Sequence, residues 1–125
     1  MQQQMKLIKV IPKIFYSDIK IGLDLFINCL GFEVKYSEGG QRPFYIIDRD
    51  GVTLFLVEDD EFAKKDRPEI RIDTDDIETL HNELKQKNID LFHSNLPAVK
   101  LQPWGLKEFA LVDKSHVCVI IQQSI

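Results

Sequence analysis

With 125 residues, of which 44% are hydrophobic and 29% charged, the chain has the composition of one globular domain and not of a disordered segment. Its 16 basic and 20 acidic residues give a formal net charge of -4, which argues against a nucleic-acid-binding surface and is compatible with a cationic ligand. The longest apolar run of the last expected strand, at residues 117–121, is far too short to cross a membrane, so no membrane partner is expected.

The start of the chain and its cysteines favour a cytoplasmic location. Residues 1–6 are polar and rich in glutamine, and no apolar region follows them, which is unlike a signal peptide. Cys29 and Cys118 lie in apolar surroundings without a C-x-x-C spacing. This pattern predicts two reduced core residues and no disulfide.

The first half of the chain predicts the order βαβββ. Residues 7–16 are rich in β-branched and aromatic residues and predict a strand. Ser17 and Asp18 then offer a helix N-cap, apolar residues follow at helical spacing, and Gly31 is placed to end the helix. Three further strands are expected at 32–37, 43–48 and 52–57.

The second half predicts the same order after a charged segment. Residues 58–67 have no apolar period and predict a solvated linker. Asp75 and Asp76 then cap a helix that runs to about Lys87. Its apolar stripe consists of Ile77, Leu80 and Leu84. Strands are expected at 69–73, 91–93, 106–113 and 117–122, with a loop at 97–105.

The two halves also match residue by residue. Residues 17–19 (SDI) align with 75–77 (DDI), and 44–56 (FYIIDRDGVTLFL) align without a gap on 109–121 (FALVDKSHVCVII). Both longer segments contain an apolar strand, an Asp, a polar turn and a second apolar strand. Such a match predicts a duplicated βαβββ unit.

A duplicated βαβββ unit resembles the vicinal-oxygen-chelate superfamily of glyoxalases, extradiol dioxygenases and bleomycin-resistance proteins. The most specific segments are 11–34 (IPKIFYSDIKIGLDLFINCLGFEV) and 102–113 (QPWGLKEFALVD), and the second resembles the bleomycin-resistance branch in particular. The chain departs from that pattern at Lys107, where an arginine is expected, and at 114–116, KSH, where P-D-G is common.

The resemblance implies a single α+β domain over residues 1–125. A first module at about 7–57 and a second at about 68–122 would be joined by the linker at about 58–67. Each module would curve its sheet into a half-barrel, with the helix on the convex face and a groove on the concave face.

Alternation along the strands sorts residues between these two faces. The residues expected against the helices are Val52, Leu54, Leu56, Val117, Val119 and Ile121. The residues expected in the groove on the last strands are Thr53, Phe55, Val57, Cys118, Ile120 and Gln122, and on the first strands Ile11, Lys13, Phe15, Glu69, Arg71 and Asp73. If the hairpins pair evenly about their turns, Phe44 lies opposite Phe55 and Phe109 lies opposite Ile120.

Metal-dependent members of the superfamily have ligands at up to four related positions, which transfer to Ile11, Phe55, Glu69 and Ile120. Only Glu69 can bind a cation, whereas a metal centre needs at least two or three oxygen or nitrogen donors. The histidines are expected to be solvated surface residues, and they are His81, His93 and His116. We therefore predict no metal, no cofactor and no catalytic residue.

A metal-free groove would have an aromatic floor and an acidic rim, which suits an amphipathic aromatic cation. The candidate ligand-binding residues are Phe15, Phe44, Phe55, Glu69, Trp104, Glu108, Phe109 and Ile120. Trp104 is the candidate stacking wall, although its neighbours Pro103 and Gly105 also suit a residue that pins a loop. The phenylalanines could equally be core residues. Glu108 leans toward the convex side by alternation, so its place in the groove follows from the resemblance alone.

Bleomycin-resistance proteins are dimers that sequester the drug without modifying it, in grooves shared between subunits and often with an exchanged first strand. The resemblance therefore implies a homodimer that sequesters a bleomycin-like or other aromatic, cationic molecule, with a role in antibiotic resistance. The alternative is a metal-dependent lyase, isomerase or dioxygenase of the glyoxalase type, which the four ligand positions disfavour. A third is a binder of an unrelated metabolite.

Overall fold

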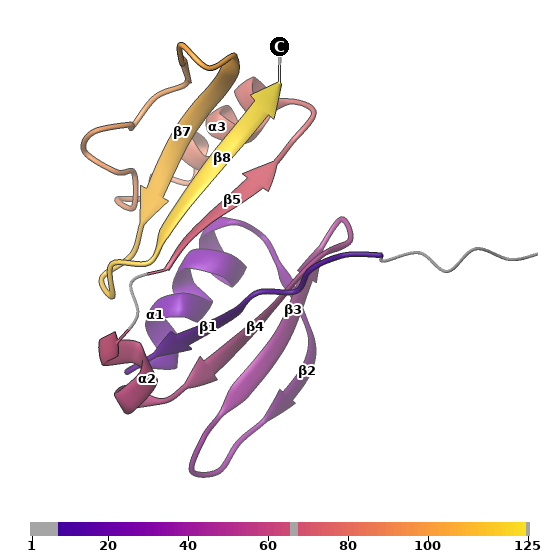
Figure 1. Ribbon diagram of the computed structural model, residues 1–125, viewed down its shortest axis with the longest axis vertical. Helices are drawn as coiled ribbons and strands as arrows, with labels where there is room; N and C mark the ends of the chain where they lie inside the picture. The colour runs from indigo at the N-terminus through magenta and orange to yellow at the C-terminus, as the bar shows by residue number, and fades with distance from the viewer. Residues whose placement is uncertain (1–7, 66–67, 125) are drawn as a thin grey trace, which may run out of the picture.

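The computed structural model describes residues 8–65 and 68–124, which form two four-stranded sheets (Figure 1). The strand order is β1-β4-β3-β2 in one sheet and β5-β8-β7-β6 in the other. In both sheets the first strand pairs in parallel with the last, and the other neighbours pair antiparallel. The expected α+β fold of two βαβββ modules is confirmed.

The first module consists of four strands and one helical segment. Its strands are β1 (Lys13–Tyr16), β2 (Glu33–Glu38), β3 (Phe44–Arg49) and β4 (Val52–Glu58). Between β1 and β2, helix α1 (Ile19–Leu23) continues into a wider π-helical turn, η1 (Asp24–Cys29). Asp18 accepts a hydrogen bond from the Lys20 amide, and Gly31 follows the last turn at φ 74°. Both helix ends are therefore as expected.

Strand β1 is shorter than the strand expected at 7–16, of which residue 7 lies outside the described residues. Residues 8–12 precede β1, and Ile8 and Val10 in this segment are 83% and 88% exposed. Pro12 has no backbone donor, but its carbonyl accepts from the Phe55 amide at 3.0 Å. The chain therefore joins the sheet at this residue, and in the segment before it Lys9 Nζ donates to Thr53 Oγ1 of β4 at 2.9 Å.

A short helix, α2 (Asp60–Lys65), lies where the sequence predicted only a solvated linker. Its side chains form ion pairs one turn apart, Lys64 with Asp60 at 2.8 Å and Lys65 with Glu61 at 3.3 Å. Opposite charges at this spacing support a helix even without an apolar stripe. The segment between the modules therefore contains a solvated helix that the sequence analysis did not predict.

The second module has four strands, as expected, but one of them lies in the segment that was expected to be a loop. Its elements are β5 (Glu69–Asp73), α3 (Ile77–Gln86), β6 (Lys100–Leu101), β7 (Leu106–Val112) and β8 (Cys118–Ser124). Asp76 caps α3 by accepting from the Thr79 amide at 3.1 Å, as expected. Strand β6 falls inside the loop expected at 97–105, and the strand expected at 91–93 is a single bridge between Phe92 and Leu111.

One continuous core contains buried side chains from both modules. Helix α1 packs on β1 and β4, and α3 packs on β7 and β8, so one face of each sheet is covered and the other is open (Figure 1). The fully or nearly fully buried strand residues on the covered faces include Leu54, Leu56, Val117, Val119 and Ile121, as alternation predicted. Among the described residues, no helix is long and apolar enough to span a membrane.

A buried hydrogen bond joins the two modules. The Tyr16 hydroxyl, fully buried on β1, donates to Asp113 Oδ2 at 2.6 Å in the β7–β8 turn. Asp113 Oδ1 also accepts from the Ser115 and Val117 amides at 2.9 and 3.1 Å. Burial raises the pKa of Tyr16 far above its usual value and raises the pKa of Asp113, while the hydrogen bonds to Asp113 oppose its shift.

Replacing Tyr16 with Phe should lower the free energy of unfolding by about 1–3 kcal/mol, because it leaves one buried carboxylate oxygen without its donor. Urea unfolding measures this difference. Tyr45→Phe is the matched control, since the half-buried Tyr45 hydroxyl makes no hydrogen bond with a described residue. Equal, small effects of the two substitutions would contradict the role of the inter-module bond.

Candidate functional site

The open face of the first sheet carries a cluster of aromatic side chains, here called the aromatic face. Its members are Phe15 on β1, Tyr36 on β2, Phe44 on β3, Phe55 on β4 and Phe62 on α2. Phe44 and Phe55 have nearly parallel rings with centroids 6.4 Å apart, and Tyr36 lies 5.7 Å from Phe44. Phe15 stacks on Phe62 at 5.1 Å. Tyr36 and Phe62 are 49% and 48% exposed, so the cluster is accessible.

The structure therefore brings Phe15, Phe44 and Phe55 to one face, as the sequence predicted, but with a different pairing. Phe44 lies opposite Val57 and Phe55 lies opposite Ile46, so the two phenylalanines are diagonal neighbours. The expected direct pairing of Phe44 with Phe55 was wrong, because the β3–β4 turn contains only Asp50 and Gly51. Both turn residues have positive φ, 54° and 84°, which is typical of a two-residue hairpin turn.

Tyr36 and Phe62 were not predicted as site residues. Tyr36 reaches the open face because the register of β2 shifts between Val34 and Tyr36, a local irregularity that simple alternation does not reveal. Phe62 belongs to the short helix that was taken for a linker. The only sequence signal for it was a large apolar residue within a charged segment.

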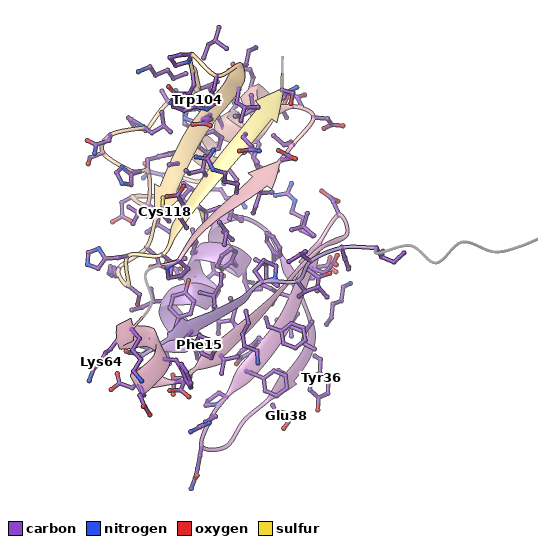
Figure 2. The ribbon with its side chains drawn as sticks, in the orientation of Figure 1. Phe15, Tyr36, Glu38, Lys64, Trp104 and Cys118 are labelled. Atoms are coloured by element: carbon purple, nitrogen blue, oxygen red, sulfur yellow. The ribbon has the colours of Figure 1, made fainter. Side chains whose placement is uncertain are left out.

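The open face of the second sheet carries a network of polar side chains centred on Glu108. Glu108 Oε2 accepts from Arg71 Nη1 at 2.8 Å and from the Trp104 indole nitrogen at 2.9 Å. Arg71 also donates to Gln122 Oε1 at 3.0 Å and lies 3.5 Å from Glu69 Oε1. Glu69, Trp104 and Glu108, three of the predicted residues, thus belong to one network. Trp104 lies over the second sheet, whereas Phe15 and Tyr36 lie over the first (Figure 2).

Glu108 is ionised at neutral pH although its side chain is only 2% exposed. Burial by itself would raise the pKa of Glu108, but hydrogen bonds from Trp104 and Arg71 and the Arg71 charge outweigh it and hold the pKa below its usual value. The carboxylate in turn fixes the orientation of the indole ring through the nitrogen of Trp104.

Trp104 is 62% exposed, so it is a surface residue and not part of the core. It precedes Gly105, whose φ of 91° permits the turn between β6 and β7. The turn is closed by the Gln102 amide, which donates to Leu106 O at 2.8 Å. With its nitrogen bound to Glu108 and its ring exposed, Trp104 offers a stacking surface beside the polar network.

The structure reverses the expected faces of Phe109 and Glu108. Phe109 is fully buried in the core, where its ring contacts His81 at 4.8 Å, while Glu108 lies on the open face opposite Gln122. The cause is the β7–β8 turn, in which five residues, 113–117, separate the paired Val112 and Cys118, with φ of 65° at His116. The first hairpin has two residues between its paired strand ends, and an odd difference in turn length moves every β7 side chain to the other face.

Ile120 lies on the open face as predicted, with Ala110 and Arg71 as neighbours, but it is only 8% exposed. Cys118 and Gln122, the other members of the predicted β8 set, lie on the same face, where Cys118 is half-buried, and Cys29 is buried in the core. Both thiols are free, and burial raises the pKa of each. The groove position predicted for Cys118 is therefore confirmed, and the core position also expected for it was wrong.

His81 is buried, which corrects its expected surface position. Its ring lies 5.1 Å from Phe92 and 4.8 Å from Phe109, and its Nε2 is 2.9 Å from Pro97 O. His81 stands one turn after Ile77 on the apolar face of α3, a spacing that the sequence already contained. The helix is thereby tied to the loop that leads to Trp104.

The transferred metal-ligand positions do not provide a metal site. Phe55 and Ile120 lie on the open faces, but their neighbours on the first strands are Lys13 and Arg71. Ile11 precedes β1 and is 43% exposed. Among the described residues, no three histidine, cysteine, aspartate or glutamate side chains gather closely enough to hold a metal ion. Cationic and apolar side chains do not fit a bound cation.

Replacing Glu108 with Gln should lower the free energy of unfolding at pH 7 by about 1–2 kcal/mol, since it removes a charge-assisted hydrogen bond to the half-exposed Arg71. The pKa of Glu108 is lowered in the fold, so its contribution is present above the unfolded pKa and is lost as the pH falls through the folded pKa. The difference between wild type and variant should therefore shrink in acid.

Urea unfolding at neutral pH and at about pH 3 measures this difference, with the unfolded carboxyl titrating near pH 4. Glu33→Gln is the control, because Glu33 is largely exposed and its ion pair with Lys35 is solvated. A Glu108→Gln effect that stays constant across this range would show that the carboxylate charge does not stabilise the network.

The fold is shared with proteins that bind small molecules. The bleomycin-binding protein from bleomycin-producing Streptomyces verticillus, complexed with copper(II)-bleomycin, has 19% identity and a TM-score of 0.76, over 98% of this chain and 100% of that chain. TnmS3, an antibiotic-binding protein from Streptomyces sp. CB03234, has 18% identity and a TM-score of 0.73, over 98% and 100% of the two chains.

A glyoxylase/bleomycin resistance protein/dioxygenase domain from Frankia sp. EAN1pec is also similar, with 12% identity and a TM-score of 0.72 over 98% of this chain and 94% of that chain. No protein-family model and no curated protein matches the chain in sequence. The structural likeness confirms the expected fold.

Proposed function

We propose that this chain, which has the fold of bleomycin-binding proteins, sequesters an aromatic, cationic small molecule without modifying it. The observation that carries the proposal is the aromatic face, where Tyr36 and Phe62 are half exposed beside the stacked rings of Phe44 and Phe55. A cluster of aromatic side chains on the open face of a sheet offers a flat ligand both apolar area and ring stacking. Trp104 would supply a further stacking ring on the second sheet.

The charges of the open faces favour a cationic ligand. On the second sheet, the carboxylates Glu69, Asp73 and Glu108 outnumber the cations Arg71 and Lys100. On the first sheet, Asp48 and Lys13 face the same side as Phe55, and Asp48 is held ionised by a hydrogen bond from Thr53, which lowers its pKa. Carboxylates around aromatic rings attract an ammonium or guanidinium group.

The chemical class of the ligand follows the known structures of this fold. The Streptomyces verticillus protein is complexed with copper(II)-bleomycin, and TnmS3 binds an antibiotic. We therefore propose a bleomycin-like or other amphipathic aromatic compound as the ligand, and antibiotic resistance as the role. Glyoxalase-type chemistry is disfavoured, because Lys13 and Arg71 stand beside Phe55 and Ile120, where a metal-dependent enzyme would need donors.

We further propose that the binding groove forms between two copies of the chain. In one copy the aromatic face is uncovered, and so are the apolar side chains of Ile8 and Val10 in front of β1. A homodimer that exchanges these N-terminal segments would cover both surfaces and bring the open faces of different sheets together. The free thiols of Cys29 and Cys118 suit a reducing cytoplasm.

Replacing Phe55 or Trp104 with Ala should weaken binding of bleomycin by roughly 1–3 kcal/mol, about 5- to 150-fold in Kd, because each removes a stacking ring. Isothermal titration calorimetry measures the affinity, and quenching of Trp104, the only tryptophan, provides a second readout. Phe109→Leu is the control: it alters the core beside His81 and should lower stability without changing affinity. Unchanged affinity in both alanine variants would refute this site.

Light scattering should find a dimer at micromolar concentrations, and Val10→Lys should shift it toward the monomer. Val10 is 88% exposed in the single chain, so a lysine is tolerated there but is disfavoured in an apolar interface. Lys20→Glu, on the exposed face of α1, is the control for a change of charge. A wild-type protein that stays monomeric would contradict the shared groove.

A further inference from the structure

We infer that a cleft between the two modules is a second binding site, selective for small amphipathic cations. The cleft has a volume of about 460 Å³ and is lined by the β3–β4 turn, the segment after η1, the β5–α3 turn and the exposed side of α3. It is formed by side chains of the covered, helix-bearing sides of the modules, such as Phe32 and Leu80, and so differs from the aromatic face. Its size lies within the range of small-molecule sites.

The floor of the cleft is apolar. Phe32 and Ile121 are buried there, and Val52, Ile72 and Leu80 are half-buried around them. These side chains come from both modules, so the floor exists only where the modules meet. An aromatic or alkyl group of a ligand would remove this apolar surface from water.

The rim of the cleft is acidic. It carries the carboxylates Asp50, Asp73, Asp75, Asp76 and Glu83. The only basic side chain in the lining is Arg49, and its guanidinium is already engaged: Nη1 donates to Leu30 O at 2.6 Å and pairs with Glu83 at 3.2 Å. The cleft therefore presents a strong excess of negative charge above an apolar floor.

The amino end of α3 opens onto this cleft, and such an end normally favours an anion. Here its amides are taken by side chains, because the Ile77 amide donates to Gln123 Oε1 at 2.8 Å and the Thr79 amide donates to Asp76 Oδ1 at 3.1 Å. Hydrogen bonds from Thr79 also lower the pKa of Asp76, which stays ionised. With these two amides occupied, the five rim carboxylates would repel an anion and attract a cation.

The ligand class is thus one positive group attached to an apolar body. The ammonium or guanidinium group of the ligand would lie among the rim carboxylates. Asp75 is the best placed to pair with it, since its carboxylate takes part in none of the contacts described above. The apolar body would lie on Phe32 and Leu80. Asp73 lines the cleft and also accepts from Gln122 of the open face at 2.6 Å, so it links the cleft to the polar network.

The test uses 4-phenylbutylamine, with 4-phenylbutyrate as the anion of matched shape, in amide chemical-shift titrations of the full chain. The amine should give saturable shifts at the amides of Thr79, Leu80 and Glu83, and the acid should give none there. Asp75→Lys should weaken binding of the amine at least about fivefold, because it reverses a rim charge. Glu78→Lys, an exposed charge reversal on α3 outside the cleft, should not.

Equal binding of the acid and the amine, or an amine affinity that Asp75→Lys leaves unchanged, would overturn the proposal. So would concentration-dependent shifts of the cleft amides in protein alone, since they would identify the cleft as a contact between copies. The variants Phe55→Ala and Trp104→Ala should retain cleft binding, which keeps this site distinguishable from the proposed groove.

Discussion

Each sheet buries one face against its own helix, and strand alternation then leaves every second side chain on the open face. Leu54 and Leu56 on β4 are buried for this reason, and Phe55 between them is not. The same alternation on β8 places Val119 and Ile121 in the core and Ile120 on the open side. The candidate site therefore consists of the strand side chains that do not pack against the helices.

The duplicated framework carries different chemistry on its two open faces. The first sheet presents stacked rings, with Phe44 and Phe55 nearly parallel, while the second presents Glu108 bound by Arg71 and Trp104. The two surfaces contribute different parts of ligand recognition. An aromatic surface binds flat ligands with little selectivity, whereas an ionised, desolvated carboxylate network selects by charge. A ligand held between such faces would have to be aromatic and cationic together.

Most of the fold follows from the sequence because its signals are local. The cap at Asp76 and the apolar stripe of α3 occur as expected, and β5 has the predicted bounds. The faces of β7 could not be predicted, because they depend on how many residues the β7–β8 turn contains. A turn with an odd number of residues in place of an even number was enough to move Phe109 into the core and Glu108 out of it.

The positions of other residues depend on contacts between segments that are far apart in the sequence. Phe62 joins the aromatic face because α2 folds back on Phe15, and the charge pattern of that segment alone favoured a solvated chain. His81 is buried where segments distant in sequence cover it: Phe92 and Phe109 lie against its ring, and Pro97 O lies 2.9 Å from its Nε2. Sequence patterns report the periodicity within an element, and they do not report which distant segment covers it.

Lys13 and Arg71 occupy equivalent positions on the first strand of each module, β1 and β5. Lys13 lies next to Phe55 on β4, and Arg71 lies next to Ile120 on β8. A cation beside each of these positions opposes a bound metal, and in the second module it has a further consequence. Arg71 helps to keep Glu108 ionised despite its burial, and Glu108 holds the indole nitrogen of Trp104 at 2.9 Å. The residue that makes the site unsuitable for a metal therefore also orients the ring that we propose stacks on the ligand.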